Sequence, residues 1–175
     1  MLGYLFLVLA VAVRFMPHPF TFTPVAAALL FWGARGSRRQ MWIPVAVLAA
    51  SDLLLDKFVY AYPFKWDLVI TWAWYAAVIV LGSGLGKRIT ALRVIGASLA
   101  SSVSFFLLSN FAVWAAYDMY PKNFGGLMTS YTLAIPFFRN AIVGDLLFST
   151  VMFATPVVLH ALSNAWGKSD HIAAA

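Results

Sequence analysis

Long apolar runs constrain the fold of this chain more than any other feature of its sequence. In residues 66–81, for example, Asp67 is the only charged residue. Runs of this kind favour membrane-spanning helices, because the strands of a membrane barrel alternate apolar with polar residues. Of the 175 residues, 63% are hydrophobic and 10% are charged, whereas a soluble domain has about 25% charged residues. The sequence therefore predicts an all-α integral membrane protein.

Six apolar segments can be counted, and we expect each to cross the membrane within a single domain of residues 1–175. They are residues 2–16, 22–34, 41–55, 66–85, 92–117 and 138–162. The second and third are short for a hydrocarbon core of about 30 Å. The connection before the last segment, residues 118–140, is long and apolar, so we expect it to fold back as a capping or re-entrant outer loop.

The basic residues predict the orientation of the chain. Seven of them fall on one side of the membrane if both termini share that side: Arg35, Arg38, Arg39, Lys87, Arg88, Arg93 and Lys168. The positive-inside rule then places both termini in the cytoplasm of a bacterial inner (plasma) membrane. The net charge of +6 is accounted for by these loops, so the lipid bilayer is the expected partner and nucleic acid is not.

Four ionisable residues fall within or at the ends of the predicted spans, all toward the outer face. They are Arg14, Asp52, Arg139 and Asp145. Each costs about 2.5–3.5 kcal/mol to insert, which makes it a candidate functional residue. One interpretation is that the two arginines neutralise the two acids and lock the bundle. The other is that part of this network lines a pocket and binds a polar group of a ligand. The two interpretations are compatible.

Further candidates lie near the same face. Asn110, in the fifth segment, could bond a neighbouring helix or a ligand. His18 is held between Pro17 and Pro19 and could donate a directional hydrogen bond. Trp66 and Trp114 either belong to an interfacial aromatic belt or stack on a flat solute.

Enzyme and cofactor chemistry are not predicted. The chain has no Cys, and its three His residues are dispersed, so neither a metal site nor another cofactor is expected. It also lacks a zinc-protease motif, a nucleophile elbow and a phosphate-binding Walker loop. We therefore expect a protein without catalytic residues.

Several blocks of the sequence resemble those of a family of uncharacterised bacterial six-span integral membrane proteins. The blocks are Arg14-Phe15-Met16-Pro17-His18-Pro19 with Thr23-Pro24-Val25-Ala26-Ala27 behind it, Ser51-Asp52-Leu53, Ser109-Asn110-Phe111-x-Val113-Trp114, Met119-Tyr120-Pro121-Lys122, and Ile135-Pro136-Phe137-Phe138-Arg139-Asn140 followed by Gly144-Asp145. More distantly, the size and six helices resemble the S components of energy-coupling-factor (ECF) transporters. Such a resemblance implies a vitamin-like ligand, a transmembrane coupling subunit and ATPases as partners. However, the first segment offers Ala10 and Ala12 without the Ala-x-x-x-Ala spacing of that family's docking face.

These observations predict a membrane-embedded substrate-binding or uptake protein for a small micronutrient, with its ligand pocket toward the outer face. In this hypothesis the arginines attract an anionic or carbonyl group and the aspartates orient them or bind an amine. The alternative is a non-catalytic structural or assembly protein that binds a partner subunit, and in it the charged network only holds the bundle together.

Overall fold

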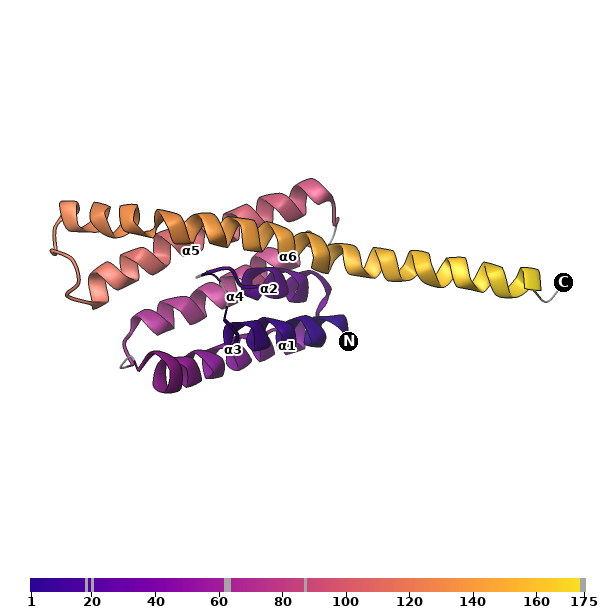
Figure 1. Cartoon of the computed structure of the whole chain (residues 1–175), viewed down its shortest axis with the longest axis horizontal. Coiled ribbons are helices and arrows are strands. Elements are labelled where there is room, and N and C mark those ends of the chain that lie inside the picture. The colour runs from indigo at the N-terminus through magenta and orange to yellow at the C-terminus, as the bar shows by residue number, and fades with distance from the viewer. Residues whose placement is uncertain (18, 20, 62–63, 87, 174–175) are drawn as a thin grey trace.

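The computed structural model describes residues 1–17, 19, 21–61, 64–86 and 88–173, with side chains up to residue 166. Within these ranges the protein is all-helical, as predicted (Figure 1). The α-helices are α1 (Leu2–Arg14), α2 (Val25–Arg35), α3 (Trp42–Leu55), α4 (Asp67–Leu85), α5 (Ala91–Ala116) and α6 (Phe124–Ala173). A 3-10 turn at Arg38–Gln40 precedes α3, and a π-helical turn at Asp56–Tyr60 continues it.

Three of these helices, α4, α5 and α6, are long and apolar enough to span a membrane. Helices α1 and α2 are apolar but shorter. With 11 residues, α2 is only about 16 Å long, roughly half of a hydrocarbon core. The structure therefore supports a membrane protein and does not confirm the predicted count of six spans.

Helix α2 forms the centre of the molecule, and nine consecutive residues, 25–33, are buried. It packs against α1, α4, α5 and α6, which is the position expected for a helix that is apolar all round (Figure 1). Glycines bring α2 and α4 into backbone contact. A Cβ atom on Gly33 would lie 2.1 Å from the carbonyl oxygen of Ile79, and one on Gly82 would lie 2.3 Å from that of Leu30.

The prediction of a capping or re-entrant loop at residues 118–140 is wrong. Helix α6 begins at Phe124 and continues through Pro136 and Pro156 to Ala173. Asn123 starts it, because its side-chain oxygen accepts a hydrogen bond from the backbone N–H of Gly126 at 2.8 Å, the geometry of a helix N-cap. Several large apolar residues of this segment are exposed on the helix surface, and others pack against α5: the rings of Phe106 and Phe138 stack 4.5 Å apart.

The two ends of the bundle differ in charge. In Figure 1 both termini and the α4–α5 connection lie at the right-hand end, whereas the α3–α4 and α5–α6 connections lie at the left. We call the right-hand end the basic end, because it carries Arg35, Arg38, Arg39, Arg88 and Arg93. The last part of α6 extends beyond the bundle on this side as a single helix (Figure 1).

Candidate functional site

A cavity of about 260 Å³ lies inside the bundle where α2 begins. Elements from the whole length of the chain surround it: α1, the segment before α2, the turn after α3, and helices α4, α5 and α6. Polar groups in its wall come from Arg14, Thr21, Thr23, Tyr60, Tyr75 and Asp145. A concave cavity with apolar walls and a few polar groups is the usual form of a small-molecule site.

The start of α2 forms one wall of this cavity, through Val25 and Ala26. The first intrahelical hydrogen bond runs from the N–H of Ala28 to the carbonyl of Pro24 at 2.9 Å. The N–H groups that precede Ala28 therefore lie at the positive end of the helix dipole, where they favour an acceptor or an anion.

Thr21 is held in an unusual backbone conformation beside this cavity. Its φ of 62° is in the left-handed region, which is unfavourable for a β-branched residue. Its hydroxyl donates a hydrogen bond to the carbonyl oxygen of Phe137 in α6. Such strain persists only where surrounding contacts fix it, so the segment before α2 is tied to α6 at the level of the cavity.

Asp52 is the centre of a hydrogen-bonded group that we call the Asp52 cluster: Arg14, Ser51, Asp52, Trp72 and Tyr75. The carboxylate is 5% exposed and forms an ion pair with Arg14. It also accepts hydrogen bonds from the indole N–H of Trp72 at 2.9 Å and the hydroxyl of Tyr75 at 3.2 Å. Arg14 donates to the Ser51 hydroxyl at 2.6 Å. The cluster joins α1, α3 and α4, so the predicted pairing of Arg14 with an acid is confirmed.

Asp145 is equally buried, at 6% exposed, but has different neighbours. One of its oxygens, Oδ2, accepts a hydrogen bond from Ser102 at 2.6 Å. Within the described residues no cation pairs with it, and no hydrogen bond is made by its second oxygen. A buried carboxyl with one donor, in the wall of a cavity, is positioned to accept a hydrogen bond from a solute.

The interpretation that both arginines neutralise the two acids does not hold for Arg139 in the part of the chain that the structure describes. Arg139 is exposed and forms no ion pair there. The reason is geometric: six residues apart on one helix, the two side chains point roughly 120° away from each other around the axis.

Asn110 lies beside the site rather than in it. It lines a second, more apolar cavity of about 480 Å³, which shares Thr21, Phe105 and Ala141 with the first. Its side-chain amide donates to the carbonyl of Phe106 on its own helix at 2.8 Å. Because the two cavities share wall residues, they could accommodate different parts of one solute.

Three other predicted positions bear on the site differently. Trp66 is exposed at the start of α4, where an interfacial aromatic residue is expected. Trp114 donates its indole N–H to the carbonyl of Pro121 at 2.9 Å and thereby closes the α5–α6 turn. Neither lines the cavity. His18 lies outside the described residues.

Sequence reasoning missed several residues of the site. Ser102 belongs to a serine-rich stretch of α5 with Ser98, Ser101 and Ser104, a signal that could have been used. Tyr60 and Tyr75 lie in a stretch rich in aromatic residues, and nothing in the sequence set them apart from their neighbours. Thr21 and Thr23 lie in the connection between the first two helices, and no sequence pattern indicated that they line a cavity. Among the described residues, no three His, Cys, Asp or Glu side chains meet to form a metal site.

Comparison with known proteins identifies a family and no relative of known activity. No curated protein and no solved structure matches the chain, so nothing connects it with ECF S components or with bacteria. A family model matches residues 1–166, which is nearly the full length. The chain therefore belongs to DUF6580, a family of unknown function.

Proposed function

We propose that this protein is a membrane-embedded binding or uptake protein for a small, vitamin-like micronutrient. The observation that carries the proposal is Asp145: a buried carboxyl with a single hydrogen-bond donor, in the wall of a cavity that the start of a half-length helix also lines. Half-helices that begin in the middle of a membrane protein commonly form solute sites, because their free N–H groups and dipole bind the solute.

The wall residues favour a flat solute with a donor on one edge and an acceptor on the other. Oxygen atoms of Asp145 and Ser102 would accept hydrogen bonds from the donor edge of the solute. The first N–H groups of α2 and the guanidinium of Arg14 would face the acceptor. Trp74, Tyr75 and Phe105 supply aromatic walls for a ring. A less polar substituent would enter the neighbouring cavity beside Asn110.

The proposal places the protein in a bacterial inner membrane, with both termini in the cytoplasm and the cavity in the outer half. Tyr75 lies eight residues into α4 from Asp67, or about 12 Å from the end of that helix opposite the basic end. The excess of arginine at the basic end supports a cytoplasmic location for that end.

An energising partner belongs to the proposal, because the chain carries no nucleotide-binding motif of its own. A coupling subunit with ATPases, as in ECF transporters, is one such partner. The small-residue face of α5 offers a docking surface: Gly96 and Ala100 are exposed, and nothing lies within 4 Å of a Cβ atom on Gly96. The adjacent Ala97 and Ser101 are buried within the bundle.

The second candidate is a structural or assembly protein, and the Asp52 cluster favours it. Its carboxylate is satisfied by three donors from α1 and α4, which leaves no need for a ligand there. A protein in which every buried polar group had such partners would require no solute. Asp145 distinguishes the two candidate functions, because it is buried with one hydrogen-bond donor and does not have a full set of partners.

Native mass spectrometry of the gently purified protein tests the proposal. We expect a co-purifying small molecule in the wild type and in the control variant Arg139→Gln, because Arg139 is exposed and does not line the cavity. In Asp145→Asn, which keeps the side-chain volume, we expect the occupied fraction to fall at least about tenfold.

Two results would contradict the proposal. One is a wild-type protein that carries no small molecule and is not stabilised by any of a panel of vitamins and their heterocyclic precursors. The other is a bound molecule retained equally in Asp145→Asn and Arg139→Gln. Thermal unfolding of each variant shows whether the fold has been kept.

A further inference from the structure

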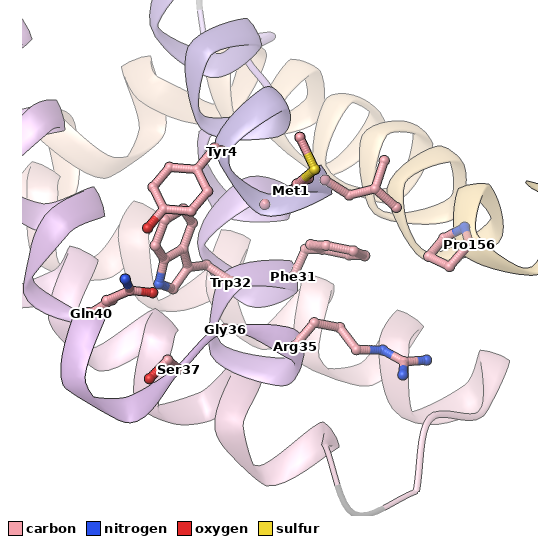
Figure 2. Close-up of a pocket in the computed structure, with 11 residues that line it drawn as sticks. Met1, Tyr4, Phe31, Trp32, Arg35, Gly36, Ser37, Gln40 and Pro156 are labelled. Atoms are coloured by element: carbon pink, nitrogen blue, oxygen red, sulfur yellow. The ribbon is translucent and has the colours of Figure 1, made fainter.

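A different cavity, of about 400 Å³, lies at the basic end of the molecule. The start of α1, the end of α2, the Arg38–Gln40 turn and Pro156 of α6 surround it (Figure 2). We propose that this cavity binds the phosphate-bearing headgroup of an anionic phospholipid from the surrounding membrane. This inference is independent of the micronutrient site, with which the cavity shares no residue.

Trp32 provides the first observation. Its side chain lines the cavity and is only 3% exposed, yet the indole N–H has no hydrogen-bond partner among the described residues. A buried donor without an acceptor is costly, so native proteins nearly always satisfy it. Two neighbours hold the indole in place: Tyr4 packs edge-on with 4.7 Å between the ring centroids, and the Gly36 backbone is so close that an added Cβ atom would lie 2.9 Å from the indole nitrogen.

Arg35 provides the second observation. Its side chain lines the same cavity and forms no ion pair or hydrogen bond within the described part of the chain. Figure 2 shows its guanidinium on the side of Phe31 and Pro156, with Ser37 and Gln40 near the indole of Trp32. The cavity thus offers one cationic donor and, across from it, several neutral polar groups, which suits a phosphate linked to a hydroxyl-bearing headgroup.

The local charge favours an anion. No acidic residue occurs before Asp52, whereas Arg35, Arg38 and Arg39 follow one another closely. The C-terminal end of α2 contributes about half a negative charge, which the three arginines outweigh. An anion is therefore the complementary ligand.

The position of the cavity identifies the anion as a lipid. Gly82 of α4 meets Leu30, and a Cβ atom on Gly86 would lie 2.9 Å from the carbonyl of Ala34, so the end of α2 is level with the end of α4. The 19 residues of α4 span about 28 Å, close to the thickness of the hydrocarbon core. Arg35 then lies where lipid phosphates lie, and basic pockets of this kind on the cytoplasmic side bind anionic headgroups. Leu2 and Phe31 supply apolar walls for the glycerol and the first acyl carbons.

Lipid-dependent stabilisation in detergent tests this proposal. The purified full chain is titrated separately with phosphatidylglycerol, phosphatidylcholine and inorganic phosphate, and its unfolding midpoint is followed. We expect phosphatidylglycerol alone to raise the midpoint. In Arg35→Gln the concentration of phosphatidylglycerol required should increase at least about tenfold. Arg38→Gln, a control that removes the same charge outside the cavity wall, should leave it nearly unchanged.

Trp32→Phe removes the indole N–H and keeps an aromatic ring, so we expect a smaller loss of the same kind. Should this core variant fail to fold, exposed Arg35 still provides the test. Three outcomes would overturn the proposal. Equal stabilisation by phosphatidylcholine would mean an apolar groove or a water-filled cavity. Stabilisation by phosphate alone would mean a site for a soluble anion. Equal losses in Arg35→Gln and Arg38→Gln would mean diffuse attraction by the basic end.

Discussion

Asp52 and Asp145 are buried to the same extent, 5% and 6% exposed, but their surroundings differ. Asp52 has an arginine, an indole and a phenol as donors, whereas Asp145 has one serine. The first arrangement compensates the loss of hydration and joins three helices, and the second leaves an oxygen for another molecule. Burial alone therefore does not identify a functional acid. The number and kind of its partners do.

Among these substitutions, Asp52→Ala should lower the free energy of unfolding most. It would leave Arg14 partly buried without its ionic partner, which typically costs about 3–5 kcal/mol. Chemical unfolding in detergent would measure the loss. The double variant with Arg14→Ala should be less damaged than the sum of the single variants. A loss below about 1 kcal/mol would remove the structural role of the Asp52 cluster.

Trp72→Phe removes one donor from Asp52 and keeps an aromatic side chain. Because the lost hydrogen bond is made to a charged group, we expect a destabilisation of about 1.5–3 kcal/mol. The matched control is Trp66→Phe, at an exposed tryptophan outside the cluster, which should change stability by less than about 0.5 kcal/mol. Equal effects of the two substitutions would contradict the role given to Trp72.

Tyr75→Phe tests the Asp52 cluster and the cavity together, because Tyr75 belongs to the cluster and also lines the cavity. The hydrogen bond that it donates is the longer one, so we expect a loss of about 1 kcal/mol in unfolding free energy. Solute binding should change as well, which native mass spectrometry would detect. If Tyr75→Phe lowered stability and left solute binding unchanged, the Asp52 cluster would have no part in the solute site.

Asp145→Asn should change stability by less than about 1 kcal/mol, in either direction. The amide oxygen can still accept the hydrogen bond of Ser102, and no cation loses a partner. Unfolding under the conditions used for Asp52→Ala gives a direct comparison. If the two substitutions were equally destabilising, the distinction between the two acids would fail.

Asp56, just beyond α3, should give a small dependence of stability on pH. Burial, together with repulsion from Asp52 and Asp67, raises the pKa of its carboxyl above the usual 3.8. The folded state therefore binds the proton more tightly than the unfolded state, and stability falls as the pH rises from 3.8 through the folded-state pKa. Asp56→Asn should remove this fall and slightly raise the unfolding midpoint at neutral pH. A midpoint that drops at neutral pH would contradict the sign.

The fold class, an all-helical protein with long apolar helices, could be predicted from sequence, because long apolar runs are compatible with few kinds of fold. The burial of Asp52 and Asp145 and the pairing of Arg14 also followed from the cost of charges in such runs. Other features could not be found in this way. Apolarity does not distinguish a residue that faces lipid from one that faces protein, so neither the central position of α2 nor the helical start of α6 could be recognised. The hydrogen-bond partners of each acid depend on how each helix is rotated about its own axis. The sequence positions of the apolar segments do not reveal these rotations.

The central position of α2 has a consequence for how the chain assembles as it is synthesised. Helix α1 precedes residues 25–33, but the other surfaces that cover them belong to α4, α5 and α6, which follow up to more than a hundred positions later. Contacts so distant along a chain form slowly, because a long loop must close before they form. The enclosure of α2 is therefore completed only when the C-terminal half of the chain has packed against it.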